Sequence, residues 1–294
     1  MHRKGGSLSE IQVLNSLTID VEDYYQVSAF ESVVRFEDWD RLESRVERNT
    51  CRILDLLDEY QTKATFFVLG WVAERQPKLV RTIYERGHEV ASHGYSHRRI
   101  YTQIPEQFRE ETRKSKRILE DIIGQKIVGY RAASYSITQK SLWAVDILSE
   151  EGFLYDSSIF PIYHDQYGMP EYHRYCHILN AEGKKRLVEF PPSTIRLAQI
   201  NVPFGGGGYL RFFPYSFTRW GIRQLNFKES QPAVVYIHPW EVDPGQPRIA
   251  AGGLSRFRHY LNLNKTEARL IRLLQDFRFG PMLKVIRERG FGKV

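Results

Sequence analysis

The sequence predicts a single α/β domain built on a mostly parallel sheet. Short apolar runs alternate with stretches of helical periodicity along most of the 294 residues, as expected when strands alternate with covering helices. Polar residues recur just after several apolar runs, which is where parallel sheets and barrels place their functional groups. A chain of this length is ordinary for one domain with one core. These observations favour an enzyme whose site lies at the strand ends.

The expected elements follow in chain order. Short runs rich in apolar residues predict buried strands at 13–20, 64–69, 88–92, 127–130, 153–155, 188–191 and 233–237. Apolar stripes and terminal glycines predict helices at 42–60, 77–86, 105–123, 138–150 and 215–227.

Other parts of the chain are less regular. Segments 160–185 and 203–210 fit no element and are expected to be lids or substrate loops. The tail predicts one or two helices, at 264–274 and 277–286. We therefore expect a catalytic domain over residues 10–250 and a C-terminal helical extension, 251–294, packed on the same core.

Composition excludes several classes of protein. Hydrophobic residues make up 42% and charged residues 26% of the chain, which is typical of a globular protein. The net charge is +7, but the basic residues of 109–117 are mixed with glutamates, which indicates a solvated helix face and not a nucleic-acid site. Cys51 and Cys176 stand far apart and predict no disulfide framework. No apolar segment follows the basic N-terminus, so we expect no signal peptide, no membrane span and a cytoplasmic location.

The first candidate site residues are His93 and His97, four positions apart. On a helical turn, positions i and i+4 share one face, so both imidazoles could reach one metal ion. A catalytic metal commonly takes a carboxylate as well as two histidines. The alternative for such a pair is local hydrogen bonding without a metal.

A carboxylate could come from Asp20, Glu22 or Asp23, which follow an apolar run far upstream. In a continuing strand, Asp20 and Glu22 point to one side and Asp23 to the other. One such carboxylate could bind a metal while its neighbour acts as a general base. The alternative is a solvated strand end.

Two further polar residues end predicted strands. Arg131 follows the run at 127–130, where its alternative role is an ion pair, and His238 follows the run at 233–237, where it could be a core histidine. Together with the acidic cluster and the histidine pair, they suggest a metal hydrolase whose parts come from several strand ends.

The candidate residues lie in five short motifs. In chain order these are Thr-Ile-Asp-Val-Glu-Asp, Ser-His-Gly-Tyr-Ser-His, Gly-Tyr-Arg-Ala-Ala-Ser-Tyr-Ser-Ile, Tyr-Asp-Ser-Ser-Ile-Phe-Pro and Tyr-Ile-His-Pro-Trp-Glu. The series is similar to the motifs of polysaccharide deacetylases of carbohydrate esterase family 4, which have the NodB homology fold. The variants most resemble deacetylases found with bacterial exopolysaccharide and exosortase (PEP-CTERM) loci. The resemblance implies a distorted, incomplete (β/α) barrel.

The resemblance also implies roles for these residues. Asp20 matches the catalytic base, Arg131 the residue that orients it, and His238 the general acid. His93 and His97 match the metal-binding histidines. Common members have two adjacent aspartates, whereas Val21 intervenes here, which favours Glu22 as third ligand and leaves Asp23 as the alternative.

Substrate contacts are expected from four aromatic residues. A backbone N–H near Tyr135 would bind the oxyanion that forms when water attacks the acetamide carbonyl. Trp240 would form an apolar wall for the methyl group of the acetyl group. Tyr163 and Tyr167, in the irregular segment, suit sugar faces.

The expected function is therefore metal-dependent removal of N-acetyl groups from an amino-sugar polysaccharide or its oligosaccharide precursor. The expected cofactor is a divalent metal, Zn²⁺ first, with Co²⁺, Ni²⁺ and Fe²⁺ as alternatives. The expected partner is an N-acetylated glycan and not nucleic acid. Two alternatives stay open, namely a hydrolase of a small C–N substrate on the same fold and an inactive glycan-binding module.

Overall fold

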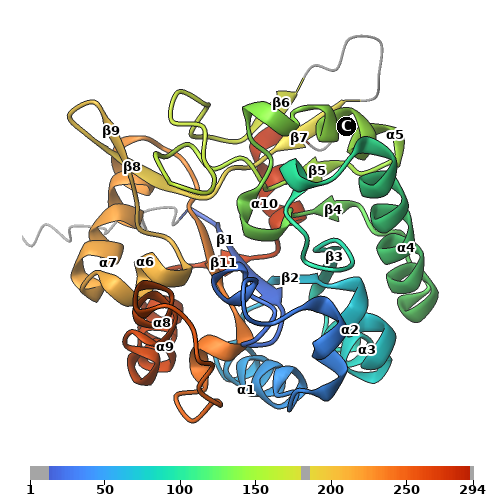
Figure 1. Cartoon of the computed structure of the whole chain (residues 1–294). Coiled ribbons are helices and arrows are strands. Elements are labelled where there is room, and N and C mark those ends of the chain that lie inside the picture. Colours follow the sequence, from blue (N-terminus) through green and yellow to red (C-terminus); the bar gives the residue numbers. More distant parts are fainter. Residues whose placement is uncertain (1–12, 180–185, 292–294) are drawn as a thin grey trace, which may run out of the picture.

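The sheet organises the whole molecule. The computed structural model describes residues 13–179 and 186–291, so the first residues of the expected domain and the end of the irregular segment 160–185 lie outside it. Nine strands run in the order β10-β1-β2-β3-β4-β5-β7-β6, with β11 pairing beside β1. All neighbouring strands are parallel except β6 and β7. Figure 1 shows the sheet curled into an open barrel with helices α1 to α5 along its outside. The predicted incomplete α/β barrel is confirmed.

The elements follow the predicted order, with ends that differ by a few residues. The strands of the sheet are β1 (Asn15–Val21), β2 (Thr65–Val68), β3 (Glu89–Ser92), β4 (Gly129–Tyr130), β5 (Tyr155–Asp156), β6 (His177–Leu179), β7 (Leu187–Glu189), β10 (Val234–Ile237) and β11 (Phe279–Gly280). The helices are α1 (Val46–Glu59), α2 (Gly70–Arg75), α3 (Pro77–Glu85), α4 (Pro105–Ile123), α5 (Trp143–Glu150), α6 (Gly207–Phe212), α7 (Tyr215–Arg223), α8 (Gly253–Tyr260), α9 (Thr266–Asp276) and α10 (Met282–Ile286).

Alternate residues of strand β1 face an apolar core and a polar network. All of its residues are buried. Leu17, Ile19 and Val21 join the main apolar core, whereas the alternate positions, Thr18 and Asp20, take part in a polar network around Arg131. This period of two is a property of any strand. It places a carboxylate inside the barrel without interrupting the outer core.

The longest helix shows how local signals set its ends. Helix α4 begins with Pro105, whose fixed backbone angle suits the first turn, and ends at Gly124, which has a φ of +66°. That left-handed conformation favours glycine. These two residues account for the close agreement between the predicted and observed bounds of this helix.

The C-terminal part differs from prediction. Residues 277–286 are not one helix, because Phe279–Gly280 form strand β11 and pair with Asn15 and Ser16 before α10 begins. The irregular segments contain β6 and most of α6, which the sequence did not predict. Between these segments lies a separate antiparallel hairpin, also unpredicted, of β8 (Thr194–Leu197) and β9 (Ile200–Pro203). Across the described residues, the helices are too short or too polar to cross a bilayer.

Candidate active site

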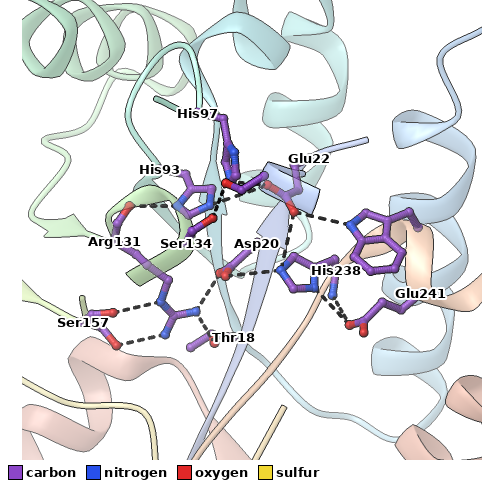
Figure 2. A network of polar contacts seen from close by, with 12 residues as sticks. Thr18, Asp20, Glu22, His93, His97, Arg131, Ser134, Ser157, His238 and Glu241 are labelled. Carbon is purple, nitrogen blue, oxygen red and sulfur yellow. Dashed lines mark hydrogen bonds and ion pairs between the residues drawn. The ribbon is translucent and has the colours of Figure 1, made fainter. Parts of the chain in front are cut away.

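The predicted site residues converge at the carboxyl edge of the sheet. Asp20 lies in β1, His93 follows β3, Arg131 follows β4 and His238 follows β10. Because these strands are parallel, their carboxyl ends meet at the same edge of the barrel. Figure 2 shows these side chains pointing toward one another, with Glu22 between them.

A possible metal site is formed by Glu22, His93 and His97. One ligand atom from each of the three lies within 4.8 Å of the other two. Oε2 of Glu22 is 2.7 Å from Nε2 of His97 and 3.9 Å from Nε2 of His93. Two imidazoles and one carboxylate are a donor set typical of Zn²⁺ and of other first-row divalent metals.

The local geometry of the histidine pair was predicted wrongly. Residues 93–97 form a bend after β3 and not a helical turn. Gly94 and His97 have left-handed φ angles of +74° and +53°, and this turn brings the second imidazole back beside the first. Non-glycine residues adopt such angles rarely, and functional sites are where they concentrate.

The chemistry of the cluster fits a cation. Nδ1 of His93 lies 2.8 Å from the carbonyl oxygen of Arg131, so Nδ1 donates its proton there and Nε2 keeps its lone pair. Burial lowers the pKa of His93 to about 4, which favours the neutral ligand form. Oε2 of Glu22 is buried and finds no well-oriented hydrogen bond within the described part of the chain. Oε2 of Glu22 and Nε2 of His93 therefore face the same point as Nε2 of His97, an arrangement of donor atoms that a cation would stabilise.

Asp23, the alternative ligand, lies outside this cluster. Its carboxylate accepts hydrogen bonds from the backbone N–H groups of Tyr24, Arg45 and Val46 and from the Ser44 hydroxyl. Val46 begins α1, so Asp23 satisfies the free N–H groups at that helix start. These contacts engage the Asp23 carboxylate outside the Glu22, His93 and His97 cluster, although β1 ends at Val21 and strand alternation does not extend to residues 22 and 23.

Asp20 is held by a fully buried arginine. Nη1 of Arg131 donates to Oδ1 of Asp20 at 2.6 Å and to the Thr18 hydroxyl at 2.7 Å. The rest of the guanidinium donates to the carbonyl and hydroxyl oxygens of Ser157, which follows β5. Because the guanidinium and Oδ1 of Asp20 have hydrogen-bond partners, the two buried charges compensate each other. The other carboxylate oxygen, Oδ2, lies 3.9 Å from Nε2 of His238.

His238 is polarised by residues that the sequence analysis missed. Its Nδ1 lies 3.1 Å from Oε2 of Glu241, and Oε1 of Glu241 accepts from Nε of the buried Arg211. Burial alone would lower the pKa of His238, but Glu241, with Glu22 and Asp20, raises it to about 9. The missed signal was the acidic residue three positions after the histidine, which here also caps the short helical turn at Pro239–Val242.

The site opens into a pocket of about 220 Å³. Tyr135, Tyr167 and Trp240 line it, and the Trp240 indole stacks on His238 with ring centroids 5.2 Å apart. The backbone N–H of Tyr135, expected to hold an oxyanion, donates to the Ala132 carbonyl in this conformation.

Tyr163 does not line this pocket. It is 73% exposed, because the adjacent Ile162 packs into the buried cluster around Phe160 and turns the next side chain outward. Its predicted contact with substrate is therefore not supported by its position, whereas that of Tyr167 is.

Family comparisons divide the chain into two parts. Residues 31–149 match the family model described as polysaccharide deacetylase. Residues 157–287 match a model described as a domain of unknown function (DUF3473). Residues 31–149 therefore resemble a polysaccharide deacetylase domain. His93, His97 and Arg131 fall within the polysaccharide deacetylase match, whereas Asp20 and Glu22 precede it and His238 lies in the second match.

Individual relatives agree with this assignment. The chain is 31% identical over 97 residues to a chitooligosaccharide deacetylase from a Bradyrhizobium species, covering 33% of this chain and 42% of that protein. It is 34% identical over 98 residues to a peptidoglycan-N-acetylglucosamine deacetylase from Bacillus cereus, covering 33% and 36%. The matches thus span about two fifths of the length of these curated relatives.

A solved structure supports one fold for both matched parts of the chain. A chain from Mycobacterium smegmatis, classed as a polysaccharide deacetylase, superposes with a TM-score of 0.61 at 22% identity. The superposition covers 98% of this chain and 94% of that one. The second part of the sequence is therefore part of the same fold.

Proposed function

We propose that this protein is a metal-dependent N-deacetylase of amino-sugar glycans. The observation that carries the proposal is the meeting of Glu22, His93 and His97 with Asp20 and His238 in one pocket. The two deacetylase relatives, which are named for chitooligosaccharide and peptidoglycan substrates, support the substrate class. A purely glycan-binding module would have no use for a buried base and acid at a metal site.

Glu22, His93 and His97 would hold the cation, with Zn²⁺ as the first candidate. When bound, a divalent metal supplies Lewis-acid activation of water and of an amide carbonyl. The neutral state of His93 and the acceptor oxygen of Glu22 suit that role.

Asp20 acts as the general base in this proposal. Its Oδ1 is committed to Arg131, so Oδ2 is the atom that takes a proton from the attacking water. Arg131 fixes the carboxylate's orientation, because its guanidinium is held in turn by Thr18 and Ser157. Precise orientation of this kind contributes to rate without direct contact with substrate.

His238 acts as the general acid. Its Nε2 lies 3.9 Å from Asp20 and 3.5 Å from Glu22, and so faces the same volume as the base. A pKa near 9 keeps the imidazole protonated at neutral pH. After attack on the amide carbon, Nε2 donates this proton to the nitrogen of the departing sugar amine, which breaks the C–N bond and releases acetate.

The proposal predicts a shift of the alkaline limb of activity. A raised pKa means that His238 loses its proton, and the enzyme its acid, only as the pH rises past about 9. In Glu241→Gln the neighbouring negative charge is gone, so the limb in kcat/KM should move down by about one to three pH units. A pH profile of acetate release from wild type and variant measures this. An unmoved limb would exclude His238 as the acid polarised by Glu241.

Within the family, we further propose an exopolysaccharide substrate and the exosortase-associated subgroup. The support for this finer assignment is the motif variants, above all Asp20-Val-Glu22 and Tyr-Asp-Ser-Ser-Ile-Phe-Pro.

Acetate release from a panel of N-acetylated glycans tests the function. The purified, zinc-loaded protein should release acetate from chitooligosaccharides or from a bacterial exopolysaccharide, and a small cyclic amide should not be hydrolysed. The opposite preference would favour the alternative of a small C–N substrate.

A further inference from the structure

A second cavity adjoins the catalytic pocket. Its volume is about 360 Å³, and it lies between α6 and α8, which are neighbours in Figure 1. Tyr167, Gly208 and Tyr236 line both cavities, so a bound molecule could extend from one into the other. We call this second cavity the apolar groove.

The groove is apolar and exposed. Phe212 at the end of α6 and Leu254 and Phe257 on α8 line it. These three side chains expose 60%, 62% and 56% of their surface. Large apolar side chains that gather around one concave surface usually mark a binding site. Aromatic rings alone could stack on sugar faces, but Leu254 and Leu261 add aliphatic surface that suits a hydrocarbon better than a sugar.

One cationic side chain, Arg258, stands where the groove meets the catalytic pocket. Arg258 is half exposed, and its ion pair with the exposed Asp165 is long, at 3.8 Å, so an anionic ligand could replace that partner. Residues 244–266 contain three arginines and one lysine but no aspartate or glutamate. A ligand that passes from the catalytic pocket to the groove therefore meets a cation at the junction. An anionic group at that point of the ligand would be complementary.

Resting on the proposed function, we propose that the substrate is an amphiphile. Its N-acetylated sugar occupies the catalytic pocket, a phosphate or diphosphate lies beside Arg258, and a hydrocarbon chain fills the apolar groove. A lipid-linked oligosaccharide has this order of parts. A longer acyl group on the scissile amide would fill the groove too, but it offers no anionic group to Arg258, whose present ion pair with Asp165 is long and exposed.

Two probes test the proposal directly. Both carry N-acetylglucosamine on a diphosphate, which ends in a farnesyl chain in one probe and in an ethyl group in the other. Acetate release is measured with the zinc-loaded protein below the concentration at which micelles form. Burial of several hydrocarbon groups should give the farnesyl probe a kcat/KM larger by about a hundredfold.

Variants locate the effect. In Leu254→Ser/Phe257→Ser the preference for the farnesyl probe should fall to about tenfold or less, with the ethyl probe unaffected. Ile104→Ser is the matched control, because Ile104 is 55% exposed and stands just before α4, outside both cavities; it should retain the full preference.

The outcomes separate the two claims. Equal efficiency on both probes, or a preference that survives the double substitution, would overturn the amphiphile and leave deacetylation intact. Competition by an N-decanoyl ethyl probe stronger than by the farnesyl probe would assign the groove to an acyl chain and also overturn it. Absence of acetate from these probes and from chitooligosaccharides alike would count against the proposed function itself.

Discussion

Asp20→Asn should slow turnover by roughly two to four orders of magnitude, the usual span of general acid–base catalysis. The amide keeps an oxygen for Arg131, so the buried guanidinium retains a partner and the fold should survive. It cannot take a proton from water at neutral pH. Metal content should not change, because Glu22, His93 and His97 are untouched. Steady-state acetate release and metal analysis of the same preparation measure both quantities.

A matched control distinguishes catalysis from structural damage. Asp243 is also buried, and its carboxylate pairs with Arg45 and Arg48 without lining the pocket. Asp243→Asn makes the same chemical change and should leave kcat within about twofold of wild type, since the carboxylate contacts none of the proposed catalytic residues. If Asp20→Asn kept wild-type turnover, the base would have to be another residue.

Arg131→Met should be the most destabilising single substitution at the site. Arg131 is fully buried and donates four hydrogen bonds to Thr18, Asp20 and Ser157. Its removal leaves the carboxylate of Asp20 buried without its partner, which typically costs about 3–5 kcal/mol in free energy of unfolding. Urea unfolding in the presence of a chelator measures this without compensation by a bound cation.

The double variant Asp20→Asn/Arg131→Met provides the control. When the charge on residue 20 is removed as well, part of the loss should return, so that the double variant is about 1–2 kcal/mol more stable than Arg131→Met alone. Free energies that simply add would show that the two side chains do not interact in the folded protein.

The fold could be predicted from the sequence because its strands and helices carry strong local signals. Pro105 and Gly124 bound α4, and β1 and β10 are continuous short runs that end at Val21 and Ile237, next to Asp20 and His238. Strand β11 was missed because only two residues take part. Its pairing with β1 depends on the tertiary position of the tail, which no local pattern encodes.

The residues of the candidate site could be proposed from the sequence, but the backbone geometry that brings them together could not. Glu22 and Asp23 have different partners, as expected, although β1 ends at Val21, before either residue. The histidine pair meets through a left-handed turn and not through a helix. The spacing of four is compatible with both. Arg211 lies far from Glu241 in the sequence, so their ion pair depends on how α6 packs against the strand end.

Metal analysis of two neighbouring substitutions tests the proposed site most directly. Glu22→Gln removes a carboxylate oxygen that faces His93 and His97, whereas Asp23→Asn alters the start of α1. We predict that zinc-loaded Glu22→Gln retains little metal and little activity. Asp23→Asn should keep one zinc per chain and lose only about 0.5–2 kcal/mol of stability. Full metal in Glu22→Gln, with loss of metal in Asp23→Asn, would contradict the assignment of the metal site.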